Sequence, residues 1–192
     1  GLNSPHGVAI GDYNNDGLNE LAFAEYGGGR VVVYKSDGTT IIKEWTALNY
    51  PYGVAIGDLD NDGANELAFT EEIGGRVTVY KSDGTTIAKQ WTGLSGPTAV
   101  TIGDYDNDGL NELAVVRGFT QITVYKNDGT TIAKQLSGLM GPTGVSIGDY
   151  NNDGLNDFAF VEHNVNRVTV AIQTKPGTIG RVAEPTIVTL RG

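Results

Sequence analysis

Acidic residues recur in this chain in four short segments with the same spacing. Each segment has the form Asp-x-(Asp or Asn)-x-Asp-Gly-x-x-(Glu or Asp), and the four begin at Asp12, Asp58, Asp104 and Asp149. In such a tight loop the side-chain oxygens at positions 1, 3 and 5 converge on one point, and the carbonyl oxygen at position 7 faces inward. Glycine at position 6 permits the sharp turn, and the acid at position 9 closes the cage. The spacing therefore predicts one cation site in each loop.

The predicted ligands are the residues at positions 1, 3, 5, 7 and 9 of each loop. Along the chain they are Asp12, Asn14, Asp16, Leu18, Glu20, Asp58, Asp60, Asp62, Ala64, Glu66, Asp104, Asp106, Asp108, Leu110, Glu112, Asp149, Asn151, Asp153, Leu155 and Asp157. Ca²⁺ accepts such an irregular set of oxygens, whereas Mg²⁺ prefers a strict octahedron with retained waters. The loops contain neither histidine nor cysteine, which disfavours zinc and copper.

Charge supports the same interpretation. The 192 residues have a formal net charge of −10, and 14 of the 23 acidic residues lie in the four loops. Ordinary Asp- and Asn-rich turns would explain one such loop, but four copies in phase favour metal binding. Because carboxylates this crowded repel one another without a cation, we expect about four Ca²⁺ ions per chain. The acidic surface disfavours nucleic acid and membranes as partners.

The loops belong to a longer internal repeat. Their first aspartates are 46, 46 and 45 residues apart, and the phrase Val-Tyr-Lys-(Ser or Asn)-Asp-Gly-Thr-Thr recurs between them from Val33, Val79 and Val124. Each unit contains four β-prone segments, in the first unit Gly7–Ile10, Glu20–Glu25, Arg30–Lys35 and Thr40–Thr46. This pattern is typical of a propeller blade, with a solenoid as the alternative. We predict an all-β propeller of four four-stranded blades in one domain, residues 1–192, with blades at about 5–50, 51–96, 97–141 and 142–192.

Turn residues support the strand assignment. Asp37-Gly38, Asp83-Gly84 and Asp128-Gly129 each lie between two β-prone runs. Such a dipeptide predicts a tight hairpin in which both central residues take a positive φ.

The loops and the blade phrasing resemble the FG-GAP repeats of the integrin α-subunit propeller and their VCBS-type relatives in bacteria and archaea, over residues 5–172. The resemblance implies that each loop joins the first two strands of a blade and binds calcium through the residues given above. The Phe-Gly and Gly-Ala-Pro signatures are absent, and the family usually closes more and longer blades than four. Either four blades close a small ring, or the chain is part of a larger ring made in trans.

The remaining residues favour binding over catalysis. The two histidines, His6 and His163, do not repeat, and no nucleophile motif is present, so we expect no enzymatic activity. The predicted function is a calcium-binding module for recognition, adhesion or assembly. Alternatives are a filament or ring subunit and a carbohydrate-binding lectin, and a module of a polysaccharide-degrading enzyme is the weakest.

Aromatic residues are the main candidates for ligand contact. Trp45 and Trp91 occupy matching positions, with Leu136 as the third counterpart, which favours packing between blades over stacking on sugar. Tyr34, Tyr80 and Tyr125 also recur in phase and are expected in the core. The less regular Tyr26, Tyr50 and Tyr52 are better candidates for an exposed contact.

Calcium use predicts the location. Extracellular modules of this loop type have affinities of roughly 10⁻⁴–10⁻³ M, suited to the calcium level outside cells. We therefore expect a secreted or cell-surface protein of a microbe, with a protein or carbohydrate ligand at the cell exterior. The last β-prone segment, Thr186–Leu190, follows a long connection, Gln173–Glu184. It is expected either to complete its own blade or to associate with the sheet edge of a second molecule.

Overall fold

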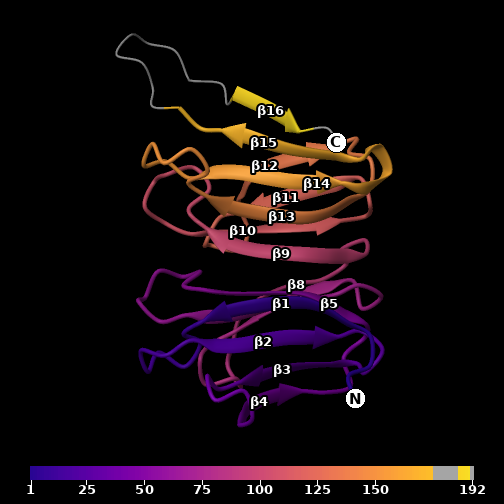
Figure 1. Ribbon diagram of the computed structural model, residues 1–192, viewed down its shortest axis with the longest axis vertical. Helices are drawn as coiled ribbons and strands as arrows, with labels where there is room; N and C mark the ends of the chain where they lie inside the picture. Colours follow the sequence, from indigo (N-terminus) through magenta and orange to yellow (C-terminus); the bar gives the residue numbers. More distant parts are fainter. Residues whose placement is uncertain (175–185, 191–192) are drawn as a thin grey trace.

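The computed structural model describes residues 1–174 and 186–190, which form four antiparallel four-stranded sheets (Figure 1). Blade 1 comprises β1 (Pro5–Gly11), β2 (Glu20–Glu25), β3 (Arg30–Tyr34) and β4 (Ile41–Trp45), and blade 2 comprises β5 (Pro51–Gly57), β6 (Glu66–Glu71), β7 (Arg76–Tyr80) and β8 (Ile87–Trp91). Blade 3 comprises β9 (Pro97–Gly103), β10 (Glu112–Arg117), β11 (Gln121–Tyr125) and β12 (Ile132–Ser137). Blade 4 comprises β13 (Pro142–Gly148), β14 (Asp157–Glu162), the 3₁₀ turn η1 (His163–Val165), β15 (Arg167–Ile172) and β16 (Thr186–Leu190).

Strands within each sheet are hydrogen-bonded in the order of the sequence. This meander, repeated four times, confirms the all-β propeller of four four-stranded blades and the period of about 46 residues. No described helix has the length and apolar character that crossing a membrane requires.

The Asp-Gly hairpins differ in one respect from the prediction. Gly38 has φ of 69°, but Asp37 is not among the residues with positive φ. Gly38 N–H donates to the Lys35 carbonyl, and the Asp37 carboxylate accepts the N–H groups of Thr39 and Thr40 at 2.8 Å each. The expected positive φ at both central residues is therefore wrong. The aspartate caps the turn with its side chain, and the glycine alone takes the left-handed conformation.

The C-terminal strand completes its own blade. β16 pairs antiparallel with β15, from Val168 opposite Leu190 to Ile172 opposite Thr186. This is the arrangement in cis of the two that the sequence allowed. Most of the connection Gln173–Glu184 lies outside the described residues.

Each blade has two unlike faces, because side chains alternate along a strand. In blade 1, Val8 and Ile10 of β1 lie on the same face as Phe23 and Leu21 of β2, their cross-strand partners. The opposite face presents Ala9, Gly11 and Ala22 from the same two strands, with valines from β3 and Trp45 from β4. We call these the large-residue face and the small-residue face. The same alternation recurs in every blade.

The hydrophobic core consists of three clusters, one between each pair of consecutive blades. In the first, Ala22, Val33 and Trp45 of blade 1 pack against Leu67 and Phe69 of blade 2. The second and third clusters repeat this contact between blades 2 and 3 and between blades 3 and 4. In each case a small-residue face receives the large-residue face of the following blade.

The repeated aromatic residues belong to these interfaces. Trp45 lies 5.1 Å from Tyr80 between ring centroids, and Trp91 lies 5.2 Å from Tyr125. Leu136, the third counterpart, packs in the third cluster. The expectation that both tryptophans pack between blades is confirmed, so neither is free to stack on a sugar. Tyr80 and Tyr125 are interface residues, as expected, whereas Tyr34 has no preceding blade to contact.

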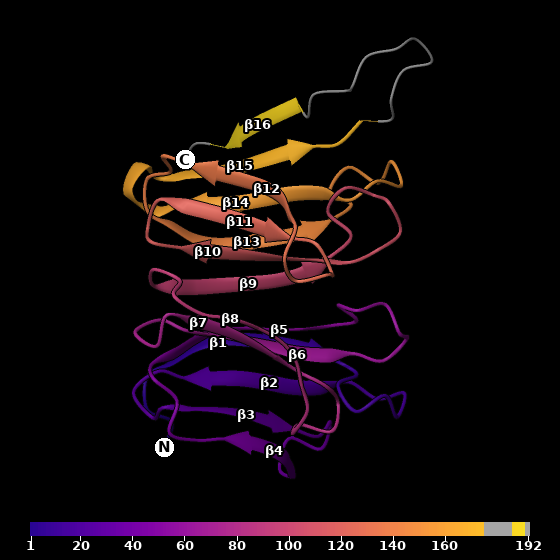
Figure 2. The same ribbon diagram turned by 180° about the vertical axis from the view of Figure 1, so that it is seen from behind.

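The four blades form an open arc. The packing of β1 on β5, β5 on β9 and β9 on β13 has no counterpart of that extent between β13 and β1 in the described part of the chain. Figures 1 and 2 show blade 1 and blade 4 extending in opposite directions from the inner strands. The large-residue face of blade 1 and the small-residue face of blade 4 are therefore not covered by another blade.

Glycine on the small-residue face sets the distance between blades. A Cβ atom at Gly11 would lie 2.8 Å from Cγ2 of Ile56, and one at Gly57 or Gly103 would lie 3.0 Å from Cγ2 of Ile102 or Ile147. At Gly148, the same position in blade 4, nothing lies within 4 Å. The isoleucine of one blade thus seats on the bare backbone of the blade before it.

This contact predicts opposite effects of one substitution at two equivalent sites. Gly11→Ala should lower the free energy of unfolding by about 1–3 kcal/mol, because the new methyl group displaces Ile56. Gly148→Ala should raise it by about 0.4–1 kcal/mol, because the methyl group meets open space and the unfolded chain loses freedom. Urea unfolding of both variants in dilute solution measures the difference. Equal effects at the two sites would show that the glycine does not set the blade spacing.

Candidate metal centre

The four acidic loops connect the first and second strands of the four blades, as the resemblance implied. In each loop the aspartate at position 1 organises the backbone. Asp58 accepts the N–H groups of Asp62 and Gly63 at 3.0 and 2.9 Å, and Asp12, Asp104 and Asp149 make the same two bonds. Glycine at position 6 has φ between 85° and 90° in all four loops. Every copy therefore has the same turn, which folds the acidic side chains back toward one another.

The acid at position 9 is buried at the start of the second strand. Glu20, Glu66, Glu112 and Asp157 are each 2 % exposed or less. One carboxylate oxygen of each accepts the backbone N–H at position 2, for example Leu59 N to Glu66 Oε2 at 2.9 Å. This bond closes the loop over its own blade and leaves the second oxygen for another partner.

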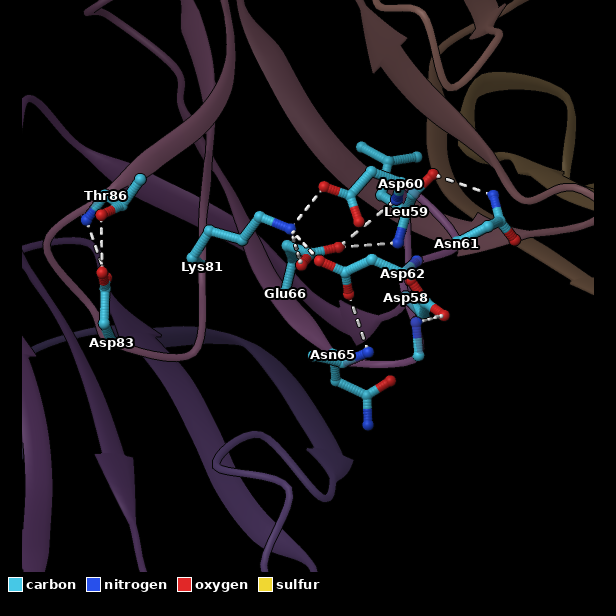
Figure 3. A network of polar contacts seen from close by, with 12 residues as sticks. Asp58, Leu59, Asp60, Asn61, Asp62, Asn65, Glu66, Lys81, Asp83 and Thr86 are labelled. Atoms are coloured by element: carbon cyan, nitrogen blue, oxygen red, sulfur yellow. Dashed lines mark hydrogen bonds and ion pairs between the residues drawn. The ribbon is translucent and has the colours of Figure 1, made fainter.

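Three carboxylates converge in the second loop, shown in Figure 3. Asp58, Asp60 and Asp62 each offer one oxygen, and these oxygens lie within 4.8 Å of one another. The Lys81 ammonium, from the end of β7, extends into the group and contacts Asp60, Asp62 at 2.7 Å and Glu66 at 3.2 Å. One monovalent cation thus lies among the carboxylates where the sequence predicts a divalent one.

The third loop repeats this arrangement, and the first and fourth differ. Asp104, Asp106 and Asp108 form the second triad, and Lys126 Nζ lies 2.6, 2.8 and 3.0 Å from Asp106, Asp108 and Glu112. In the first and fourth loops position 3 is asparagine, whose amide donates to the position-5 aspartate at 3.1 Å. The structure therefore assembles acidic triads in two of the four predicted sites, and amide-containing sets in the other two.

Two features of the second loop fit a cation with more coordination than an ammonium provides. Asp60 Oδ1 is buried and accepts no hydrogen bond among the described residues, and the buried Glu66 Oε1 has only the Lys81 ammonium beside it, at 3.2 Å. A buried oxygen without a donor is costly, and a divalent ion would coordinate both oxygens. Burial raises the pKa of Glu66 and of Glu112, which a nearby divalent charge would reverse. The adjacent lysine holds the pKa of Asp62, and of Asp108, below the ordinary value.

The residues at position 7 have a defined role in the turn. The N–H groups of Leu18, Ala64, Leu110 and Leu155 each donate to the position-5 aspartate at 2.9 Å. Ligation by their carbonyl oxygens stays a prediction.

Asparagines at positions 4 and 8, to which the sequence analysis gave no role, connect the loops of neighbouring blades. Asn65 donates its backbone N–H to Asn15 Oδ1 at 3.0 Å and its side-chain amide to the Asp12 carbonyl at 2.7 Å. Asn111 and Asn156 make the same pair of bonds to the loops before them. The signal was present in the sequence, because both asparagines occur in all four copies.

Comparison with known proteins agrees with this architecture. The family described as FG-GAP-like repeat matches three times, over residues 12–69, 58–115 and 104–160. Each match begins at the first aspartate of one loop and extends through the next loop. No curated protein matches this chain in sequence.

Solved structures show the same fold at low sequence identity. The chain is similar to the structure of BBS1N in complex with ARL6DN, with a TM-score of 0.67, 14 % identity, and coverage of 100 % of this chain and 55 % of that one. For virginiamycin B lyase from Staphylococcus aureus the TM-score is 0.64, the identity 21 %, and the coverage 97 % and 55 %. For a chain of the nidogen/laminin complex the values are 0.64, 21 %, 88 % and 60 %. This chain thus spans little more than half the length of these relatives.

The lysine among the carboxylates predicts opposite effects on the metal-free and the calcium-bound protein. Lys81→Met should lower the melting temperature in chelator, because three carboxylates lose their counter-charge. It should raise calcium affinity at the second loop about tenfold or more, because the ion no longer displaces a cation. Calorimetric titration and thermal melting measure the two effects. Lys35→Met is the matched control, since Lys35 has the same position in blade 1 but no ion pair there among the described residues. A fall in calcium affinity in Lys81→Met would contradict the competition.

Proposed function

Because the chain belongs to the FG-GAP-like repeat family, we propose that it is a calcium-stabilised, non-catalytic propeller module that acts in recognition or adhesion outside the cell. The observation that carries the calcium role is the convergence of Asp58, Asp60 and Asp62, repeated at Asp104, Asp106 and Asp108, with a buried Asp60 oxygen that has no donor in the second loop. Four loops with one backbone geometry support about four ions per chain. Loops with asparagine at position 3 would bind more weakly, because an amide oxygen carries no charge.

The acidic residues have positions that suit a structural ion. Those at position 9 are buried under their own loops, and those at positions 1 and 5 accept backbone N–H groups of the turn. Groups fixed in this way organise a turn around a cation and are not free to transfer protons. His6 packs on Tyr52 with ring centroids 4.2 Å apart, and His163 lies in η1 of blade 4. This distribution supports a binding role.

An aromatic cluster favours carbohydrate or peptide recognition as the activity of the module. Tyr26 lies 4.7 Å from Tyr50 and 5.9 Å from Tyr52 between ring centroids, and His6 lies 5.1 Å from Tyr26. Tyr50 is exposed, and a hydrogen bond to the Glu72 carboxylate raises the pKa of Tyr26. These residues lie at the opposite ends of the strands from the acidic loops. Of the three tyrosines Tyr50 is exposed, and Tyr26 and Tyr52 are half-buried. Accessible rings beside a carboxylate suit a ligand with apolar faces and hydroxyl donors, such as a sugar.

Location follows from the calcium requirement. Calcium sites in exposed loops of this kind have dissociation constants in the range of the extracellular calcium concentration. The chain contains no cysteine, so no disulfide bond contributes to its stability. A secreted or cell-surface place, in a microbe, is part of the proposal.

Calcium removal is the direct test of the structural role. Excess chelator should lower the melting temperature, because each site contributes about 1.4 kcal/mol for every tenfold excess of free ion over its dissociation constant. Asp58→Ala should remove one ion per chain by calorimetric stoichiometry. Asp60→Asn, which reproduces the natural residue of the first and fourth loops, should retain the ion with lower affinity. An identical melting curve with and without chelator would refute the proposal.

The aromatic cluster provides a second test. Tyr52→Ala should abolish binding on a glycan array or an extracellular-matrix peptide array, while calcium stoichiometry stays unchanged. Phe119→Ala removes an exposed ring outside the cluster, 58 % accessible in a turn of blade 3, and should leave binding intact. If both variants bind like the unmodified chain, recognition does not use this cluster.

A further inference from the structure

We propose that the asparagine at position 8 of an acidic loop couples that loop to the loop of the preceding blade, so that an occupied loop raises the calcium affinity of its neighbour. The residues concerned are Asn65, Asn111 and Asn156. This inference rests on the proposed calcium role of the loops. It adds a positioning role for side chains that hold no ion themselves.

Asn111 lies between predicted ligands of two loops. In the chain it directly precedes Glu112, the buried position-9 acid of the third loop. Its side-chain amide donates to the Asp58 carbonyl at 2.7 Å, and its backbone N–H donates to Asn61 Oδ1 at 3.2 Å. Asp58 is the position-1 residue whose carboxylate organises the turn of the second loop. Asn111 is thus joined covalently to a predicted ligand of one loop and by a hydrogen bond to a predicted ligand of the other.

The position-4 asparagine forms the other half of the link. Asn61 has φ of 59°, in the left-handed region that asparagine adopts more readily than most residues with a side chain. Its amide donates to the Leu59 carbonyl of its own loop at 3.2 Å (Figure 3), while its oxygen accepts the Asn111 N–H. The acceptor for the third loop is therefore in place only while the second loop holds its turn.

The same two bonds join every consecutive pair of blades. Asn65 bonds in this way to Asp12 and Asn15 of the first loop, at 2.7 and 3.0 Å. Asn156 bonds to the third loop, at 3.0 Å to the position-1 carbonyl and 2.7 Å to the position-4 oxygen. A path of hydrogen bonds and backbone therefore connects the four loops, and it passes through positions 1 and 9 of each interior loop.

The second and third loops are the pair in which the asparagine link is best isolated. Between blades 1 and 2 the Tyr13 hydroxyl, at position 2 of the first loop, also donates to the Lys81 carbonyl at 3.0 Å. Leu59 has this position in the second loop, and it has no hydroxyl. Both loops of this pair also contain an acidic triad. The effect of Asn111 can therefore be measured between two sites of the same kind.

Coupling follows from the cost of ordering a loop. Asp104, Asp106 and Asp108 repel one another without a cation, so an empty loop resists the turn that brings them together. A neighbouring loop that holds its turn presents the two acceptors to Asn111 at fixed positions. Once these bonds have formed, the third loop has less conformational freedom to lose when it orders, which raises its affinity. Linkage requires the same factor in the opposite direction.

A purely structural role for these bonds predicts a different result. Loss of one asparagine would then lower the melting temperature equally in chelator and in calcium, and each loop would keep its affinity whatever its neighbour holds. Repulsion between two bound ions would have the opposite sign, because an occupied loop would weaken its neighbour. Only coupling through the asparagine makes the affinity of one loop fall when the adjacent loop is emptied.

The test is a calcium titration of the 192-residue chain by NMR, read at the backbone amide of the position-6 glycine in each loop. These N–H groups bond to the position-1 carboxylates at 2.9 Å and so report their own loops: Gly17, Gly63, Gly109 and Gly154. Asp106→Ala removes a ligand from the third loop and keeps its turn, because the Asp106 carboxylate accepts no backbone N–H among the described residues. We expect Asp106→Ala to weaken calcium binding at the second and fourth loops about fivefold or more.

Asn111→Ala removes the link between the second and third loops and leaves that of Asn156. In this background Asp106→Ala should no longer change the affinity of the second loop, whereas the fourth loop should still lose about fivefold. Asn61→Gly tests the same link from its other side if Asn111→Ala fails to fold, because glycine keeps the positive φ and lacks the acceptor. Asn19→Ala is the matched control: Asn19 has position 8 in the first loop and donates to no other loop among the described residues, so the coupling should persist.

Two results would overturn the coupling and leave the calcium role intact. One is a second-loop affinity that does not depend on Asp106→Ala in the chain with all its asparagines. The other is a dependence that persists in both Asn111→Ala and Asn61→Gly. If none of the four glycine amides responds to calcium, the proposed function itself is refuted, and the coupling with it.

Discussion

The seating of a large-residue face on the small-residue face of the preceding blade is the contact on which the rest of this structure depends. A four-stranded sheet with two apolar faces cannot bury either face alone, so no blade is expected to be stable without a neighbour. The glycine beneath each isoleucine brings the inner strands close, and the tryptophan or leucine of the outer strand fills the wider space farther out. The distance between blades is thereby fixed by a small residue near the inner strands and by a large residue near the outer strands.

The candidate metal loops are part of this packing and not an addition to it. The residue at position 2 of a loop lies in the interface with the next blade, and the asparagine at position 8 bonds to the loop of the blade before. The acid at position 9 is buried where the loop joins the second strand. A cation that draws positions 1, 3 and 5 together would therefore stiffen the same segment that holds two blades in register. Lys81 and Lys126, which follow β7 and β11 and reach the second and third loops, show that the fold already places positive charge at these points.

Much of this architecture could be predicted from the sequence, because the same pattern of strand and turn residues occurs in all four repeats. Strand positions followed from β-branched residues between turn residues, and the loops from fixed positions of Asp and Gly. The predicted hairpin conformation was wrong, because the Asp37 side chain accepts the N–H groups of the turn. The dipeptide Asp-Gly alone does not specify this hydrogen bonding. Lys81 and Lys126 could not be assigned to the loops from spacing, because the register between the second and third strands of a blade brings each lysine beside the acid at position 9.

Openness of the arc is a property that no single repeat encodes. Each unit specifies how it meets the next one, and the angle between units, accumulated over the number of blades, decides whether the last meets the first. Blade 1 has Val8, Ile10 and Leu21 on the face that the other blades use for packing, and blade 4 has glycine at the position on which an isoleucine seats in the other blades. Because all four repeats have the residues of an interior blade, the repeat specifies the contact between neighbours and leaves the number of blades open.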